Sequence, residues 1–196
     1  MQITEVDFYQ LVKPRAGHMQ AGDMVFFEED ELTIKLAIID GVGHGGPAHE
    51  VAVMASKQLS NYFESDLVET LKRLNTTLAG TVGAAVGLCL IDKAKAEMSY
   101  CGVGNTAARK MAQEDTHFVS LDGTLGLYMR TPKVFKSELE RGDVLVFHTD
   151  GISTQYNRRD FPRLTIERAR TVAESLLERF GKAHDDAGCA VLKIKQ

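Results

Sequence analysis

The stretch Leu36-Ala37-Ile38-Ile39-Asp40-Gly41 joins an uninterrupted apolar run directly to an acidic residue and a glycine. A short apolar run bounded by turn residues is typical of a strand that is buried on both faces. Asp40 would then stand at the end of this strand. A glycine-rich turn follows at residues 41–46, and Pro47 suits the first turn of a helix. The sequence therefore predicts that Asp40 lies at a junction between a buried strand and a helix.

Three other acidic motifs, distant from one another in the sequence, also adjoin apolar segments. They are Gly22-Asp23, Asp150-Gly151 and Asp185-Asp186. If the apolar segments are buried strands, they deliver these carboxylates to one end of a packed sheet. Several carboxylates in a small volume of low dielectric constant raise one another's pKa, and a hard divalent cation removes that conflict. The motifs together predict a metal centre.

The donor atoms at this centre indicate which metal it binds. All of the candidates are oxygen donors, which favours Mg²⁺ or Mn²⁺, whereas zinc would require more His or Cys. Two such ions held by shared carboxylates can activate a water molecule at neutral pH and align it with a phosphorus atom. Hydrolysis of a phosphate monoester depends on this charge stabilisation and positioning more than on a protein nucleophile. The expected reaction is therefore hydrolysis of a phosphate monoester.

The composition limits the other possibilities. The chain has 196 residues, 44% of them hydrophobic, so we expect a single domain over residues 1–196. Lys and Arg total 23 against 27 Asp and Glu and are interspersed with them, which argues against a nucleic-acid partner. The three cysteines lie in apolar segments without close pairing, as reduced core residues do. With neither a signal-peptide pattern nor an apolar run of ~18 residues, we expect a cytoplasmic monomer that makes no membrane contact.

Hydrophobic periodicity predicts an α+β fold. It indicates strands at residues 3–12, 24–28, 32–39, 84–91, 96–102, 118–121, 134–139, 144–148 and 189–194. It indicates helices at residues 48–63, 66–79 and 165–180, the last closed by Gly181. A turn is expected at residues 141–143. Many strands of hairpin type, with helices grouped in two places, favour two packed antiparallel sheets with helices outside them over a parallel βαβ fold.

Five motifs also follow an order and spacing that resemble a known family. They are Ala21-Gly22-Asp23, Ile39–Gly45, Gly102–Asn105, His148–Ile152 and Asp185-Asp186-Ala187. These motifs resemble those of the metal-dependent serine/threonine protein phosphatases, the PPM family, and specifically of its bacterial SpoIIE-like branch. The resemblance extends from about residue 20 to the end of the chain. It implies a four-layer αββα sandwich with the metals at one end of the two sheets.

The resemblance implies a role for each motif at the metal centre. Asp40 would bridge two Mn²⁺ or Mg²⁺ ions, and the carbonyl of Gly41 would complete one of the two sites. Asp150 would bind the other ion. Asp23 would either bind a metal directly or hold metal-bound water, and the sequence leaves these two options open.

Two further assignments depend on neighbouring residues. Asp185 would bind the same ion as Asp150, and Asp186 would lie behind the metal ligands, although the sequence does not decide which of the two adjacent carboxylates faces the metal. His44 is the nearby imidazole that could protonate the leaving serine oxygen, so it is a catalytic candidate. Other metal-dependent phosphatases place a histidine directly after the Asp-Gly, where Val42 stands here, and this favours a structural role for His44.

The remaining polar candidates are interpreted as structural. Larger relatives grip phosphate with an arginine upstream of the first acidic motif, but Lys13 and Arg15 lack a matching local pattern and suit a solvated surface pair. His148 suits a core histidine that is satisfied by hydrogen bonds. Asn105 suits a polar residue that turns the chain after Gly104.

The resemblance implies a protein phosphatase that acts on phosphoserine or phosphothreonine of a signalling partner. Because the chain is barely larger than the catalytic unit of the family, the expected partner is a phosphorylated STAS-domain protein of the stressosome or anti-anti-sigma type. One alternative is a pseudophosphatase that regulates by docking, although retention of Asp23, Asp40, Asp150 and Asp185 argues against it. Another is a metal-dependent hydrolase of a small phosphomonoester, which the sequence does not exclude.

Overall fold

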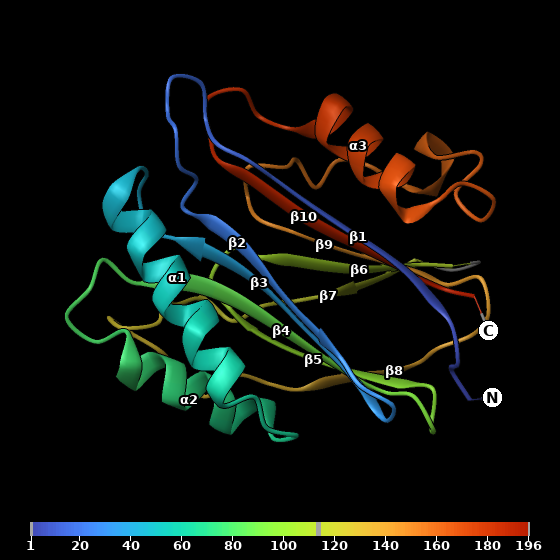
Figure 1. Ribbon diagram of the computed structural model, residues 1–196, viewed down its shortest axis with the longest axis horizontal. Coiled ribbons are helices and arrows are strands. Elements are labelled where there is room, and N and C mark those ends of the chain that lie inside the picture. The colour runs from blue at the N-terminus through green and yellow to red at the C-terminus, as the bar shows by residue number, and fades with distance from the viewer. Residues whose placement is uncertain (1, 113–114, 196) are drawn as a thin grey trace.

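The protein contains two five-stranded antiparallel sheets, seen in a computed structural model that describes residues 2–112 and 115–195 (Figure 1). Sheet A has the strand order β1 (Val6–Lys13), β10 (Ala187–Ile194), β9 (Val144–His148), β6 (Ala107–Met111) and β7 (Thr116–Phe118). Sheet B has the order β2 (Asp23–Glu29), β3 (Thr33–Gly41), β4 (Ala84–Asp92), β5 (Glu97–Val103) and β8 (Phe135–Glu138). The antiparallel sheets predicted from the sequence are confirmed.

Helices cover the outer face of each sheet, as Figure 1 shows. Two of them, α1 (Gly46–Asn61) and α2 (Leu67–Thr77), pack on sheet B. The third, α3 (Ala169–Phe180), packs on sheet A and is preceded by a 3-10 turn, η1 (Arg158–Asp160). This arrangement is the four-layer αββα sandwich that the motifs implied. Within the described residues, no helix is long and apolar enough to cross a membrane.

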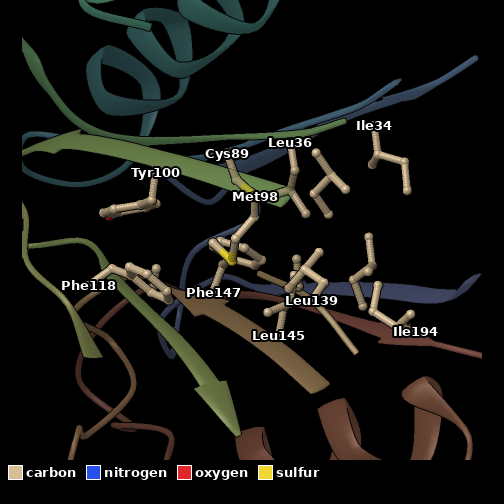
Figure 2. Close-up of a cluster of buried hydrophobic side chains, with 14 of the residues drawn as sticks. Ile34, Leu36, Cys89, Met98, Tyr100, Phe118, Leu139, Leu145, Phe147 and Ile194 are labelled. Carbon is tan, nitrogen blue, oxygen red and sulfur yellow. The ribbon is translucent and has the colours of Figure 1, made fainter. Parts of the chain in front are cut away.

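The side chains of β3 alternate between two apolar cores. Those that pack between the two sheets are Ile34, Leu36 and Ile38. Those that pack towards α1 are Ala37 and Ile39. Figure 2 shows the layer between the sheets, including Leu36, Tyr100, Leu145 and Phe147. Because successive side chains of a strand point to opposite faces, Asp40 takes the same face as Leu36 and Ile38 and stands at the end of the space between the sheets.

The third helix begins later than the sequence predicted. Apolar spacing indicated a helix from residue 165, but α3 starts at Ala169. Residues 161–167 instead form tight turns that bury Phe161 and Leu164 beneath α3. The backbone N–H of Ala169 donates a hydrogen bond of 3.0 Å to the carboxylate of Asp7 on β1, and this contact fixes the start of the helix. A tertiary partner therefore sets a boundary that helical periodicity alone placed too early.

The turn predicted at residues 141–143 is confirmed, whereas the strand predicted at residues 118–121 differs in the structure. The turn at residues 141–143 connects β8 of sheet B to β9 of sheet A, so it links the two sheets and does not close a hairpin. The segment predicted as a strand at residues 118–121 is a strand only up to Phe118. Leu121 then makes an isolated parallel bridge to Val103 of the other sheet. The chain thus crosses between the sheets at both places.

Candidate metal centre

The acidic motifs meet at one end of the sandwich, at the end of the space between the two sheets. Asp23 and Asp40 are direct partners in the pairing of β2 with β3 in sheet B. Asp150 lies two residues after the last residue of β9 in sheet A, and Asp185 lies two residues before the first residue of β10. An open pocket of about 480 Å³ lies between Asp40, Asp150 and Asp185. Its lining residues include Asp40, Gly43, Asn105, Asp122, Asp150 and Asp185.

Glycine at positions 41 and 151 allows the backbone to pass close to other segments beside these carboxylates. A Cβ atom at Gly41 would lie 2.3 Å from the carbonyl oxygen of Ala48 in α1. A Cβ atom at Gly151 would lie 1.7 Å from the carbonyl oxygen of Asp186. Neither position can hold a larger residue without movement of the backbone. The Asp-Gly pairs therefore place an acidic side chain at the pocket and a close backbone contact directly behind it.

The carboxylates of Asp23 and Asp40 are strongly perturbed. Burial raises the pKa of Asp40 to about 8, and the negative charges of Asp23, Asp150, Asp185 and Asp186 add to the effect. Burial also raises the pKa of Asp23 to about 7, although a hydrogen bond from Thr149 opposes the rise. The ion pairs found among the described residues include none of these carboxylates. Within the part of the chain that the structure describes, these carboxylates thus form no ion pair that would balance their negative charge, which suits a site for cations.

The donor set fits oxygen-binding metals with incomplete protein coordination. Among residues 2–112 and 115–195, no three His, Cys, Asp or Glu side chains lie close enough together to enclose one ion. Mg²⁺ commonly binds through only one or two carboxylates and retains several waters. The carbonyl of Gly41 and water would therefore have to complete any site built on Asp40, Asp150 and Asp185.

The two adjacent aspartates before β10 face different surroundings. Asp185 lines the pocket. Asp186 is only 4% exposed, and its two carboxylate oxygens accept hydrogen bonds from the backbone N–H groups of Arg15 (2.7 Å) and Gly22 (2.8 Å). These bonds attach the segment before β2 to the start of β10. The sequence left open which of the two aspartates faces the metal. Asp185 is the better candidate, because both oxygens of Asp186 already accept hydrogen bonds.

Two neutral side chains, missed by the sequence analysis as partners of the acids, contact them directly. The amide of Asn105 donates a 2.6 Å hydrogen bond to Asp150 at the exposed edge of the pocket. The hydroxyl of Thr149 donates a 2.6 Å hydrogen bond to Asp23 in the interior. Both residues belong to motifs that the sequence displayed, but Asn105 was interpreted as a turn residue only. The one available signal was their position, Thr149 directly before Asp150 and Asn105 at the end of the Gly102–Asn105 motif.

The basic and imidazole candidates lie around this end of the molecule. His44 is exposed, and its ring centroid lies 5.0 Å from that of His18 in an edge-on contact. His148 is buried, and its Nδ1 lies 2.8 Å from the carbonyl oxygen of Thr149, so its interpretation as a satisfied core histidine is confirmed. Arg15 is half-buried, and its Nε is buried without a hydrogen-bond partner among the described residues. The interpretation of Arg15 as half of a solvated surface pair is therefore wrong.

Comparison with known proteins gives matches in both sequence and structure. The family model described as Stage II sporulation protein E (SpoIIE) matches residues 30–195. The phosphoserine phosphatase RsbX of Bacillus subtilis (strain 168) is 26% identical over 147 residues, which cover 74% of this chain and 73% of RsbX.

Two solved structures share the architecture over nearly the whole chain. RsbX in complex with magnesium has a TM-score of 0.86 at 20% identity, with 99% of each chain covered. A chain from work on the bacterial stressosome, described as a modular system adapted to control secondary messenger signaling, has a TM-score of 0.90 at 24% identity. That match covers 97% of this chain and 100% of the other. At these identities, the two structures demonstrate a common fold.

Proposed function

This chain belongs to the SpoIIE family, and from that premise we propose that it hydrolyses phosphoserine or phosphothreonine on a signalling protein with the help of two Mg²⁺ or Mn²⁺ ions. The observation that carries the proposal is the meeting of Asp40, Asp150 and Asp185 at one open pocket whose lining, among the described residues, includes no Lys or Arg. The family inferred from the motifs agrees with the family model. We further propose that residues 1–196 form one phosphatase domain.

Each acidic residue has a proposed task in holding the ions. Asp40 would be shared between them, and the Gly41 carbonyl would complete one of the sites. Asp150 and Asp185 would hold the second ion. Asp23, the buried neighbour of Asp40, would bind an ion directly or hold metal-bound water. When bound, the two cations would supply a nucleophile at neutral pH and counter the negative charge of the phosphoryl group.

The chain's own residues would organise the reaction around these ions. The depth of Asp40, at the end of the space between the sheets, keeps its carboxylate in surroundings of low dielectric constant, where its interaction with a cation is strong. His44, which follows the pocket residue Gly43, is the candidate proton donor for the leaving serine or threonine oxygen, but Val42, in the place where other metal-dependent phosphatases have a histidine, favours a structural role for His44.

The proposed partner is a phosphorylated STAS-domain protein of the stressosome or anti-anti-sigma type, a proposal supported by the similarity to RsbX and to a stressosome protein. No basic side chain of residues 2–112 and 115–195 lines the pocket, so recognition would depend on contacts around it. Val42, which lines the pocket, is exposed, as are Val82 and Leu127 on either side of Gly83. Val42 donates a backbone hydrogen bond to Gly83, and Leu127 also lies beside Gly83, so the three form one surface. Such a surface suits a folded partner better than a flexible peptide.

The test compares three substrates at saturating Mn²⁺. They are an intact phosphorylated STAS domain, the matching phosphopeptide and p-nitrophenyl phosphate, each also assayed with EDTA. We expect metal-dependent turnover of all three, with the highest catalytic efficiency on the intact domain. The variant Leu127→Ser should lower efficiency on the domain and leave turnover of p-nitrophenyl phosphate unchanged.

Each contrary result leads to a different alternative. If none of the three substrates is hydrolysed with Mn²⁺ or Mg²⁺, the pseudophosphatase is favoured. Turnover of p-nitrophenyl phosphate without any activity on STAS domains would favour a small phosphomonoester or a different protein substrate. Equal efficiency on the intact domain and the phosphopeptide would exclude recognition of a folded partner.

A further inference from the structure

A buried hydrogen-bond relay joins the two sheets behind the pocket. Thr149, at the end of β9 in sheet A, has no exposed surface, and Asp23, the first residue of β2 in sheet B, is 5% exposed. The Thr149 Oγ1 donates to Asp23 Oδ2 at 2.6 Å. The backbone N–H of Gly188 donates to the same Thr149 Oγ1 at 3.0 Å.

The donors and the distances favour one direction for this relay. A hydroxyl has one proton to donate, and the Gly188 N–H can only donate. Gly188 N–H supplies a hydrogen to Thr149 Oγ1, and the single hydroxyl proton has two acceptors in reach, Asp23 Oδ2 at 2.6 Å and the carbonyl oxygen of Gly188 at 3.4 Å; the shorter contact favours Asp23. A hydrogen bond from a hydroxyl to a carboxylate is charge-assisted and is typically 2.5–2.7 Å long, which agrees with the observed 2.6 Å.

The backbone around Thr149 is shaped to make this contact. The backbone N–H of Thr149 donates to the carbonyl of Gly188 at 3.0 Å, so residues 149 and 188 remain neighbours just beyond the last paired residues of β9 and β10. A Cβ atom at Gly188 would lie 3.2 Å from Asp23 Cβ and 3.4 Å from Asp23 Oδ2. The absence of a side chain at Gly188 thus leaves space for the Asp23 carboxylate beside Thr149.

We propose that Thr149 is a positioning residue that fixes the orientation of the Asp23 carboxylate for cation binding. The inference rests on the proposed function, since it assigns Asp23 to the same metal centre. With Oδ2 held by Thr149, Oδ1 is the oxygen that remains available to an ion or to its water. Asp23 therefore contributes one oxygen to the centre. Thr149 also precedes Asp150 in the chain, so the relay couples a carboxylate of sheet B to the segment that carries one of sheet A.

The exposed contact between Asn105 and Asp150 differs from this relay in one respect. Asn105 lies at the solvent-exposed edge of the pocket, where water can replace its amide. Thr149 and Asp23 lie where solvent has little access, so the loss of the hydroxyl leaves a buried carboxylate oxygen without a donor. The orientation of Asp23 should therefore depend on Thr149 more than that of Asp150 depends on Asn105.

The primary test is titration calorimetry with MnCl₂ on metal-free protein. Thr149→Val removes the hydroxyl and keeps the shape, and Thr149→Ser keeps the hydroxyl. Loss of a residue that orients a metal ligand typically weakens affinity by about 10–100-fold. We expect such a loss for Thr149→Val and near-wild-type affinity for Thr149→Ser. If Thr149→Val does not fold, Thr149→Ala supplies the same comparison.

A matched control separates positioning from general stability. Thr70 in α2 is also fully buried, and its Oγ1 accepts from Glu64 N and donates to Asp66 O, both at 3.1 Å, outside the pocket. Thr70→Val should lower the melting temperature in EDTA and leave Mn²⁺ affinity unchanged. Thr149→Val should lower the affinity and also reduce the rise in melting temperature that Mn²⁺ produces.

The outcomes distinguish the inference from the proposed function. If wild-type protein binds no Mn²⁺ and hydrolyses no p-nitrophenyl phosphate, the proposed function fails, and the inference fails with it. If wild-type protein binds Mn²⁺ and folded Thr149→Val binds it equally well, the role of Thr149 is refuted and the proposed function stands. If Thr149→Ser binds Mn²⁺ as weakly as Thr149→Val, the role of Thr149 is also refuted, because keeping the hydroxyl would then not preserve the affinity.

Discussion

The open pocket and the buried layer directly behind it differ in how many hydrogen bonds their carboxylates accept. At the pocket, Asp40 and Asp185 have no cationic side chain as a partner among the described residues. Behind it, Asp23 and Asp186 accept hydrogen bonds from a hydroxyl and from backbone N–H groups. Neutral donors hold a carboxylate in place without cancelling its charge. The difference teaches that the fold orients its acids with neutral groups and leaves their charge available for cations.

The largest expected effect comes from removing a carboxylate of the pocket. Asp40→Asn and Asp150→Ala should each reduce turnover of p-nitrophenyl phosphate at least ~100-fold, comparable to loss of one preorganised electrostatic group. Both variants should remain folded, because removal of one charge relieves repulsion among the acids. Turnover assays with Mn²⁺, together with circular dichroism and thermal melts, measure both properties. Near-wild-type turnover in either variant would contradict the metal assignment.

Substitution of the adjacent acids Asp185 and Asp186 tests most directly whether the pocket and the buried layer behind it have different roles. Asp185→Ala should lose activity with little change in stability. Asp186→Ala leaves two backbone N–H groups without partners, which costs roughly 2–3 kcal/mol and lowers the melting temperature by roughly 5–10 °C in a protein of this size. Thermal melts in EDTA measure the second effect. The same phenotype in both variants would show that the pocket and the layer behind it are not functionally separate.

A smaller effect concerns the pH dependence of the metal-free protein. The folded pKa of Asp40, about 8, exceeds its unfolded value, so the native state binds more protons than the unfolded state up to that pH. Its contribution to stability is therefore complete below the unfolded pKa and is lost as the pH rises through about 8. Asp23, with a folded pKa of about 7, acts in the same direction.

The window from pH 6.5 to 8 isolates this effect. Burial lowers the pKa of His148 to about 4, so His148 makes stability rise with pH only up to its unfolded value of 6.5. Above that value, the melting temperature in EDTA should fall on the order of 2–4 °C, equivalent to about 1 kcal/mol. Asp40→Asn should flatten the decline. A wild-type melting temperature that is constant or rising over this window would refute the prediction.

The smallest expected effect is that of His44→Ala. General acid catalysis contributes roughly 10²–10⁴-fold where it operates. Because His44 is exposed and contacts His18, we expect its loss to reduce turnover of a phosphoserine protein by less than about tenfold. A phenolic ester, whose leaving group needs little protonation, serves as the control. A larger loss on the phosphoserine protein alone would show that His44 is the required acid.

The local sequence was sufficient to find the strands and the acids at their ends. Apolar runs such as residues 36–39 form buried strands because their composition and length leave few alternatives, and an Asp-Gly directly after a run marks the strand end. The same local reasoning failed at the start of α3, where a hydrogen bond to Asp7 from another strand sets the boundary. Periodicity contains no information about such a partner.

By itself, the sequence determined which carboxylates are candidates and that they lie at one end of two packed sheets. Only the tertiary structure decided how each one is oriented. The run before Asp40 is apolar at both odd and even positions, so only the packing of the sheets assigns Asp40 to the space between them. The Asn105 and Thr149 hydrogen bonds join residues 45 and 126 positions apart, and neutral side chains leave no periodic pattern. Chain topology brings such donors close to their acceptors, and the local sequence of neither segment predicts that the two will meet.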